Sequence, residues 1–320
     1  MTDAQTLARF VRAHPRLLVL TGAGVSTASG IPDYRDAEGR WKRTPPLSHQ
    51  EFLRSEPARR RYWARSLIGW PRIAASRPNA AHRALARLER AGYVHSLLTQ
   101  NVDGLHQRAG SARVIELHGS LSRVLCLDCG VNLSRIAVQR MLEAHNPAFL
   151  SLPAGLAPDG DAELACADLE GFRVPECPRC GGLLKPDVVF FGAGVPAARV
   201  EAALLALARA DALLVVGSSL MVYTGYRLCL AARDMGKPIA AVNLGRTRAD
   251  ELLRLKIEAP CAIVLAQLIQ ALSPARAESE GVFLAQRAVG HACLGASTAC
   301  SGQRSERGQD IMESGGPPGC

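Results

Sequence analysis

The 320-residue sequence is poor in aromatic residues, at 5%, and it contains no long apolar run. A membrane span needs about eighteen consecutive apolar residues, so we expect no transmembrane helix. The N-terminus also lacks the charged, apolar and small-residue pattern of a secretory signal, which predicts a cytoplasmic protein. The composition, 48% hydrophobic and 21% charged, is typical of a folded globular chain.

Lysine is scarce as well: it occupies four positions, so 34 of the 38 basic residues are arginines. The formal net charge is +9, and ten arginines gather between residues 54 and 90. Surfaces that bind single-stranded nucleic acid interleave basic residues with aromatic platforms, and no such platform accompanies these arginines. We therefore favour solvated helix faces over a nucleic-acid or acidic-substrate surface.

Cysteine, in contrast, is plentiful, with ten residues. The chain length, the missing signal and the uneven spacing argue against a secreted disulfide scaffold. Four cysteines form two Cys-x-x-Cys pairs, each followed by glycine: Cys126 with Cys129, and Cys177 with Cys180. Four thiolates suit tetrahedral Zn²⁺ and leave no open position for a reacting water, so the pattern predicts one structural zinc ion. The alternative is two unrelated redox or core pairs.

The other six cysteines have simpler interpretations. Three are expected to be buried small apolar residues, Cys166, Cys229 and Cys261. Three more fall in a C-terminal stretch rich in Ala, Gly, Ser, Gln and Arg, residues 273–320, whose composition is typical of a disordered tail. These three, Cys293, Cys300 and Cys320, are expected to be exposed thiols.

Short β-rich runs alternate with helical stretches along most of the chain. Buried parallel strands are predicted at residues 17–20, 94–98, 213–216 and 239–242. A helix should follow Asn79 as N-cap and stop at Gly92, and another should cover residues 196–210 with Val200, Leu204 and Leu207 facing inward. This alternation predicts an α/β fold with a doubly wound, Rossmann-like parallel sheet.

Two stretches interrupt the alternation, residues 36–76 and residues 123–186, the second with the cysteine pairs and an "APDGD" turn at 157–161. We expect them to form one small helical and zinc-binding module inserted into the sheet domain. The sheet domain would then consist of residues 1–35, 77–122 and 187–272.

The first predicted strand leads into "TGAGVSTASGIPDYR" at residues 21–35. Gly22 would allow a tight turn and Gly24 would let a pyrophosphate approach the backbone, as in dinucleotide-binding folds. Thr27, however, stands where that fingerprint has its third glycine. The loop therefore predicts a nucleotide site that differs from that of a dehydrogenase.

Polar residues follow several of the predicted strands. Because the carboxyl ends of parallel strands form the ligand crevice, these side chains should converge on the glycine loop. The first group is Gln100, Asn101, Asp103, His106 and His118, and the second is Gly217, Ser218, Ser219 and Asn243. The second group could hold phosphate or ribose. The pattern does not choose between His106 and His118 as a general base.

Taken in order, these motifs resemble the sirtuins, NAD-dependent protein lysine deacylases, over about residues 7–272. The resemblance rests on the glycine loop, "QNVDGLH", "LHG", the cysteine pairs, "LKPDVVFFG", "GSSLMVY" and "VNLG". Tyr34 in "PDYR", together with "RYWARSLIGW" and "GSSLMVYTGYR", looks like class II, the sirtuin-four branch.

The resemblance implies that NAD is consumed as a co-substrate. Nicotinamide leaves, the acyl-lysine oxygen attacks C1′ of the ribose, and the acyl group moves to ADP-ribose. His118 would be the general base, for which a pKa near neutrality is suitable, with Asn101 and Asp103 as catalytic partners. The implied NAD contacts are Gly22, Ala23, Gly24, Ser26, Asp33, Tyr34, Arg35, Gln100, Asn101, Asp103, Gly217, Ser218, Ser219, Asn243, Leu244, Gly245 and Cys261.

The resemblance also implies that an acyl-lysine peptide pairs as an extended strand between two segments. These contribute Val189, Phe190, Phe191 and Gly192 on one side, and Val222 and Tyr223 on the other. Ala193 departs from the acidic residue usual in the family. Where sirtuins remove acidic acyl groups, a Tyr and an Arg at the spacing of Tyr62 and Arg65 read the distal carboxylate. Alternatively, Arg65 is a surface arginine beside a core tyrosine.

Two alternatives to the deacylase remain open at this point: a protein mono-ADP-ribosyltransferase on the same scaffold, and a weakly catalytic NAD-sensing binding protein. Thr27 and the predicted zinc module disfavour a dehydrogenase. We expect acyl-lysine proteins or peptides as partners, no membrane, and a monomer.

Overall fold

The structure is a computed structural model that describes residues 1–42, 46–151, 155–156, 162–163 and 169–273. Contacts group Met1–Pro274 into one compact unit. The subdivision of this unit into a sheet domain and an inserted module stays a prediction. The "APDGD" turn, Cys166 and the expected disordered tail with its three cysteines lie outside the described residues.

Six parallel strands form the main sheet, in the order β11-β10-β9-β1-β2-β3. They are β1 (Leu17–Thr21), β2 (Val94–Thr99), β3 (Val114–Glu116), β9 (Ala212–Val216), β10 (Ile239–Val242) and β11 (Leu255–Ile257). The four predicted strands are confirmed. The sequence pattern missed β3 and β11 because these short edge strands are mostly half-buried and carry no continuous apolar run.

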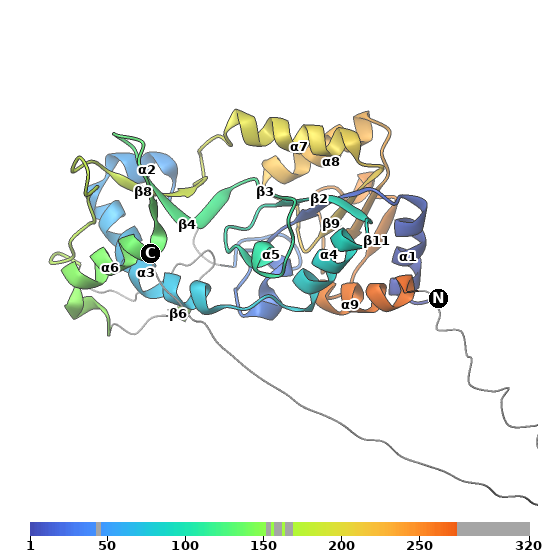
Figure 1. Cartoon of the computed structure of the whole chain (residues 1–320), viewed down its shortest axis with the longest axis horizontal. Helices are drawn as coiled ribbons and strands as arrows, with labels where there is room; N and C mark the ends of the chain where they lie inside the picture. The colour runs from blue at the N-terminus through green and yellow to red at the C-terminus, as the bar shows by residue number, and fades with distance from the viewer. Residues whose placement is uncertain (43–45, 152–154, 157–161, 164–168, 274–320) are drawn as a thin grey trace, which may run out of the picture. The chain divides into compact units, whose positions relative to one another are not determined.

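Helices cover both faces of this sheet (Figure 1). The helices α1 (Asp3–Ala13), α4 (Ala80–Arg90) and α9 (Cys261–Leu272) share one apolar core with the sheet. The helices α7 (Ala197–Arg209) and α8 (Tyr223–Asp234) share the other. Val19 points into the first core, whereas Leu18 and Leu20 point into the second. Because successive side chains of a strand point to opposite faces, β1 anchors both layers, and the doubly wound fold is confirmed.

The ends of α4 follow the predicted signals. The Asn79 side-chain oxygen accepts hydrogen bonds from the backbone N–H groups of Ala81 and His82, and Gly92 adopts a left-handed φ of 85°. The predicted inner face of α7 packs against the core but is only partly buried. Leu207 is buried, but Val200 and Leu204 are half-buried, and alanines complete the buried face. Alanine carries little apolar signal, which is why the sequence pattern missed it.

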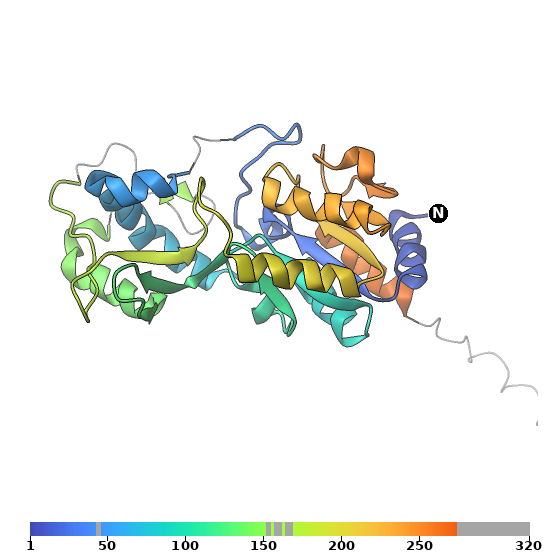
Figure 2. The same ribbon diagram turned by 90° about the horizontal axis from the view of Figure 1, so that it is seen from above.

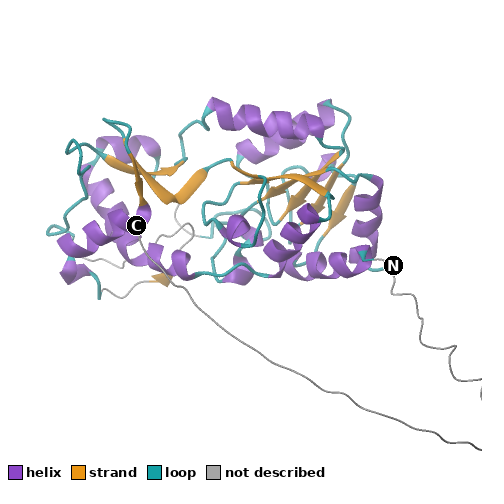
Figure 3. Ribbon diagram, viewed as in Figure 1, coloured by secondary structure: helices purple, strands orange, loops and turns teal. Residues whose placement is uncertain are grey.

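A second, antiparallel sheet lies among the helices of the inserted stretches, in the order β5-β4-β8 (Figure 2). Its elements are β4 (Gly119–Cys126), β5 (Asn132–Ser134) and β8 (Leu184–Val188), with α2 (His49–Arg54), α3 (Glu56–Ala75) and α6 (Arg135–His145) beside them. The short strands β6 (Gly155–Leu156) and β7 (Ala162–Glu163) form a separate pair, and α5 (Leu105–Arg108) follows β2. Figure 3 shows both larger sheets flanked by helices.

The two inserted stretches share one apolar core. Trp63 and Leu67 of α3 pack with Val124, Val138 and Phe172 from the second stretch. Side chains from both stretches therefore pack against each other in this small core, and a separate module remains a prediction.

Arg135, the first residue of α6, is buried at the edge of this small core, with 1% of its surface exposed. Its guanidinium donates to the Ser66 carbonyl and hydroxyl and to Gln139 Oε1, and it stacks on the Trp70 ring at 4.7 Å. Burial lowers the pKa of Arg135 to about 10. The hydrogen bonds and the ring offset the desolvation of this charge.

Among the described residues, none of the helices combines the length and apolarity required to cross a bilayer.

Candidate active site

Two glycine-bearing loops meet at the carboxyl ends of the adjacent strands β1 and β9. The Gly24 N–H donates to the Gly217 carbonyl at 2.9 Å. A Cβ added to Gly24 would lie 2.9 Å from the Gly217 oxygen, and one added to Gly217 would lie 2.4 Å from the Val25 nitrogen. Gly217 also has a positive φ of 58°. Contact between the two loops therefore requires these glycines, whatever ligand approaches them.

The loop after β2 brings two predicted residues against the first glycine loop. Asn101 Nδ2 donates to the Gly22 carbonyl at 3.0 Å and to Ser26 Oγ at 3.1 Å. Ser26 Oγ donates in turn to Asp103 Oδ2 at 2.7 Å, and the Leu105 N–H donates to Asp103 Oδ1. Burial raises the pKa of Asp103 against the opposing effect of these hydrogen bonds. The predicted convergence of Asn101, Asp103 and Ser26 is present in the structure.

Gln100 connects three parts of the crevice. Its Oε1 accepts a hydrogen bond from Ser218 Oγ at 2.9 Å, and its backbone carbonyl lies 3.1 Å from His118 Nδ1. A Cβ added to the α8 residue Gly225 would lie 2.9 Å from Gln100 Nε2. Gln100 thus joins the second glycine loop, the start of α8 and His118.

His118 is the half-buried histidine of this crevice. A carbonyl can only accept, so Nδ1–H donates to Gln100 and Nε2 keeps its lone pair. Thr224 Oγ1 lies 2.8 Å from Nε2 and donates to it. Burial, with a smaller contribution from Arg199, lowers the pKa of His118 to about 4, despite the hydrogen bond to Gln100. The expected pKa near neutrality is therefore wrong for this structure, and the imidazole is neutral at physiological pH.

His106, the other candidate base, lies beneath the crevice in a buried polar chain. Thr21 Oγ1 donates a hydrogen bond to Thr99 Oγ1 at 2.9 Å. His106 Nε2 lies 2.9 Å from the same Thr21 oxygen. Because the Thr21 proton is already used, Nε2–H of His106 is the donor in this second hydrogen bond. The His106 and His82 rings are 4.7 Å apart. Burial lowers the pKa of both histidines, His82 to about 4 and His106 well below its ordinary value. His106 supports the strand ends, and this arrangement favours His118 as the base.

The segment after the first glycine loop folds back on itself. Arg35 donates to the Gly39 carbonyl at 2.7 Å, and its guanidinium lies 3.9 Å from the centre of the Trp41 ring. Burial lowers the pKa of Arg35. Asp33 pairs with Lys42. The predicted NAD contacts Asp33 and Arg35 therefore have intramolecular partners here.

This segment also reaches the two regions that flank the crevice. The Tyr34 and Trp41 rings lie 6.3 and 5.4 Å from the Phe191 ring. On the other side, the Arg246 N–H donates to the Ala37 carbonyl at 2.8 Å. Residues 33–42 therefore connect the predicted peptide segment with the "VNLG" segment.

The remaining predicted nucleotide contacts lie at the ends of β9 and β10 and at the start of α9. Asn243 is buried, and its side-chain amide donates to the Leu244 carbonyl at 2.8 Å, whereas the Leu244 side chain is exposed. The Cys261 thiol contacts the Gly24 carbonyl at 3.5 Å, and burial raises its pKa to about 11. Cys261 and Cys229 are both buried, as predicted.

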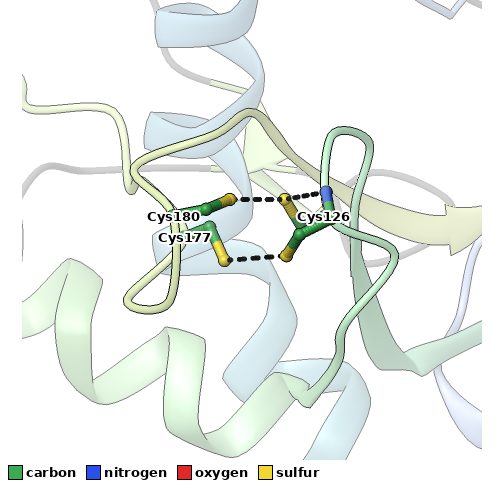
Figure 4. Close-up of side chains that lie close together, drawn as sticks. Cys126, Cys177 and Cys180 are labelled. Carbon is green, nitrogen blue, oxygen red and sulfur yellow. Dashed lines mark hydrogen bonds between the residues drawn. The ribbon is translucent and has the colours of Figure 1, made fainter.

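The four predicted zinc ligands gather in one cluster, with their sulfur atoms all within 4.8 Å of one another. Cys126 Sγ lies 3.5 Å from Cys180 Sγ, and Cys129 Sγ lies 3.8 Å from Cys177 Sγ (Figure 4). Tetrahedral Zn²⁺ with Zn–S bonds of about 2.3 Å requires sulfurs about 3.8 Å apart, far longer than a disulfide. Gly130 and Gly181 both have a φ of 71°, which forms the tight turn after each pair. The donor set fits one structural zinc ion.

Comparisons with known proteins identify the family. The profile of the Sir2 family matches residues 22–224. An NAD-dependent protein deacetylase of Bordetella bronchiseptica is 57% identical over 269 residues, which cover 84% of this chain and 98% of the relative. The chain belongs to the Sir2 family, the sirtuins. A relative named NAD-dependent protein deacetylase 2, from Bradyrhizobium diazoefficiens, is 58% identical over 265 residues, which cover 83% and 97% of the two chains.

Solved sirtuin structures share the fold. One described as "Sir2-p53 peptide-NAD+" has a TM-score of 0.70 and 30% identity, covering 84% of this sirtuin and 98% of that chain. Another, "Structure of Sir2Tm bound to a propionylated peptide", has a TM-score of 0.66 at 30% identity, with the same coverage.

The predicted peptide segments of this sirtuin lie on both sides of His118. The Val189 N–H donates to the His118 carbonyl at 2.8 Å, and the His49 N–H donates to the Phe191 carbonyl at 2.8 Å. Gln50 Nε2 donates to the Gly192 carbonyl at 3.0 Å. On the other side Val222 is the N-cap of α8, and the Tyr223 side chain is 56% exposed.

Tyr62 and Arg65 lie one turn apart on α3. The Tyr62 ring packs 5.3 Å from the Phe190 ring and 5.5 Å from the Phe52 ring, so it contacts the predicted peptide segment. Arg65 is half-buried. Tyr62 is thus part of an aromatic cluster beside the predicted peptide segment.

Sequence reasoning missed two sets of residues around His118. The first is Thr224, which contacts the ring directly. The second is an ion-pair chain in which Asp187 pairs with both Arg199 and Arg123, each at 2.9 Å, and Arg123 also pairs with Glu116 at 2.8 Å. Neither set has a local sequence signature, since each contact joins different elements of the fold.

Proposed function

We propose that this sirtuin is an NAD-dependent protein lysine deacylase that moves the acyl group from lysine to ADP-ribose and releases nicotinamide. The observation that carries the proposal is the set of contacts around His118: Nδ1 lies 3.1 Å from the Gln100 carbonyl, Nε2 lies 2.8 Å from Thr224 Oγ1, and Gln100 also accepts a hydrogen bond from Ser218. The names of close relatives support the same activity. We assign the chain to class II, the sirtuin-four-like branch, on "PDYR" and "VYTGYR".

The residues of the crevice have distinct roles in this proposal. NAD supplies the bond that breaks between nicotinamide and ribose. Asn101, Asp103 and Ser26 form a hydrogen-bonded wall beside the glycine loop, which excludes water from the developing positive charge. His118 Nε2 accepts a proton from a ribose hydroxyl, so that this oxygen can attack the carbon of the former acyl-lysine amide. Residues 33–42 form the cover, since they bridge Phe191 and Arg246.

We also propose acyl-lysine proteins as the partners. The peptide would lie between the segment of Val189 to Gly192 and the start of α8, where Val222 and Tyr223 stand. The structural zinc ion would hold the neighbouring module and take no part in the reaction. A monomer in the cytoplasm is the simplest assembly and location for this activity.

Nicotinamide release tests the function directly. Wild type and His118→Ala are compared with NAD and a panel of acetyl, long-chain, lipoyl, succinyl and glutaryl lysine peptides. Release should depend on one acyl class and fall by at least about 100-fold in His118→Ala, since a general base contributes that much. His145→Ala is the matched control, because His145 is exposed and belongs to α6. It should behave as wild type.

The products separate the alternatives. Acyl-ADP-ribose should accumulate in proportion to the nicotinamide released. Protein-bound ADP-ribose in its place would indicate a mono-ADP-ribosyltransferase. Slow release that ignores every peptide, equal in wild type and His118→Ala, would indicate NAD sensing and would overturn the proposal.

The acyl preference has its own test, Arg65→Met. If Tyr62 and Arg65 read a distal carboxylate, the variant should lose any preference for succinyl or glutaryl over acetyl peptides, because the guanidinium supplies the charge-assisted hydrogen bond. An unchanged ratio of rates would show that Arg65 has no part in acyl recognition.

A further inference from the structure

The hydrogen bonds of His118 fix which nitrogen is the base. Nδ1–H donates to the Gln100 carbonyl at 3.1 Å, so the lone pair belongs to Nε2. The Thr224 hydroxyl lies 2.8 Å from Nε2, within the range of a good O–H···N hydrogen bond. Since Nε2 can only accept in this tautomer, the hydroxyl of Thr224 is the donor.

Thr224 is the second residue of α8, and the helix begins at the crevice. The N-cap residue, Val222, makes no side-chain capping hydrogen bond, so the first turn directs uncapped N–H groups and a partial positive charge toward this end. A nearby positive charge disfavours imidazolium. The start of α8 and the Thr224 hydroxyl therefore both favour neutral His118.

The charged groups near His118 come from other elements. Arg199 of α7 opposes protonation of the ring, and Asp187 of β8 pairs with Arg199 at 2.9 Å and with Arg123 of β4. Arg123 pairs further with Glu116 of β3. Each of these arginines thus has a carboxylate partner. Thr224 differs from them because it contacts the basic nitrogen itself.

A small cavity lies beside Thr224. Leu117, Val195 and Arg227 line it together with Thr224. Threonine in a helix populates two χ1 rotamers, so a rotation about its Cα–Cβ bond would move the hydroxyl off Nε2 without displacing α8.

We propose that Thr224 is a positioning residue for the general base: its hydroxyl holds the Nε2 lone pair of His118 toward the crevice and yields that place to the ribose hydroxyl of NAD. The inference rests on the proposed function, because it takes His118 as the base. No proton is transferred to Thr224. The proton that the base accepts comes from the ribose hydroxyl, and Thr224 only exchanges one hydrogen-bond partner for another.

The test compares Thr224→Val, which keeps the shape and removes the hydroxyl, with Thr224→Ser, which keeps the hydroxyl. We expect kcat of Thr224→Val to fall about threefold to tenfold, the range for one lost hydrogen bond. The acidic limb of its pH–rate profile should move to higher pH, because the lost donor stabilised the neutral ring. NAD affinity, measured by direct binding, should change little. Thr224→Ser should restore both the rate and the profile.

A readout without turnover is the NMR titration of the His118 imidazole, assigned by its loss in His118→Gln. The pKa of His118 should rise in Thr224→Val and return in Thr224→Ser. Ser122→Ala is the matched control. Ser122 lies four residues after His118 in the sequence. Its hydroxyl contacts the Ser120 hydroxyl, and no contact with the His118 ring is described. It should leave the rate, the profile and the titration unchanged.

Different outcomes would refute the proposed function and the proposed role of Thr224. If His118→Ala keeps full activity, the proposed base is wrong, whatever Thr224 does. If His118→Ala is inactive while Thr224→Val matches wild type in rate, profile and titration, Thr224 has no positioning role. If Thr224→Ser is as slow as Thr224→Val, restoring the hydroxyl does not restore the rate, and the inference is overturned.

Discussion

The six-stranded sheet and the small module are held together in different ways. The sheet has a large apolar core on each face, and its polar site is a set of side chains that hydrogen-bond to one another. The module has a single smaller core and a cluster of four sulfurs. We therefore expect the polypeptide alone to preorganise the nucleotide site, and a bound ion to fix the two cysteine loops of the module.

The largest expected effect is the loss of the module's folded structure when zinc is removed. All three tryptophans of the sequence, Trp41, Trp63 and Trp70, lie in the first inserted stretch, so tryptophan fluorescence reports on the module. Metal binding contributes on the order of 10 kcal/mol in small zinc domains. Removal of zinc by a chelator, or the double change Cys177→Ser and Cys180→Ser, should therefore abolish the fluorescence signature of buried Trp63. Zinc content is measured alongside.

Cys229→Ala is the control for that experiment, since Cys229 is buried in the core under α8. It should keep its zinc and its fluorescence. A chelated wild-type protein that retains both its fluorescence and its melting temperature would contradict the view that the module needs the ion.

The next largest effect is a loss of stability in acid, caused by buried histidines of the sheet domain. Burial lowers the pKa of His82 and His118 to about 4 and that of His106 well below its ordinary value. The unfolded chain therefore binds more protons than the folded chain below about pH 6.5. The free energy of unfolding should fall by about 1.4 kcal/mol per pH unit for each histidine between about pH 6.5 and 4.

Urea unfolding at pH 7, 6 and 5 measures this slope. His106→Gln removes one titrating group and should flatten the slope while lowering stability at pH 7. Equal slopes in wild type and variant would show that His106 does not titrate on unfolding.

A smaller loss of stability is expected when the buried charge of Arg135 is removed. Arg135→Met should lower the free energy of unfolding by about 1–3 kcal/mol, because it leaves the buried Ser66 hydroxyl and Gln139 oxygen without their donor. Thermal melts followed by tryptophan fluorescence measure the change. A variant as stable as wild type would mean that desolvation of the guanidinium cancels its hydrogen bonds.

The smallest effect should come from the arginine-rich surface of α3. Arg61 pairs with Glu51 at 3.3 Å, but both side chains are largely exposed. Arg61→Ala should change stability by less than about 0.5 kcal/mol, since solvent and salt screen such pairs. A loss above 1 kcal/mol in the same melts would show that this surface stabilises the module more than an ordinary solvated helix does.

Much of the sheet could be predicted from the sequence because its inner strands are continuous apolar runs, as at Leu17–Thr21. The zinc cluster could be predicted because its ligand spacing is local. The rule that strand ends converge also predicted that Asn101 and Asp103 lie against the glycine loop. In these cases the physical cause lies within a few residues of the motif.

Other features could not be predicted, because they depend on contacts between residues far apart in the sequence. Thr224 lies on a helix more than 100 positions after His118, and a threonine there gives no sign of its partner. The pKa of His118 could not be predicted either, because burial is a property of the packed crevice. Edge strands such as β3 have mixed composition, so their pairing with β2 decides their conformation.

The order of the strands also determines when each part of the molecule can form during synthesis. The central strand β1 leaves the ribosome about 190 residues before its neighbour β9, which begins at Ala212. The two glycine loops follow β1 and β9, so the site that they form together cannot exist until β9 has been translated. The cysteine cluster is complete in sequence at Cys180, well before β9. A nascent chain can therefore capture its metal while the nucleotide site is still unfinished, and β1 must wait for its partner without pairing wrongly.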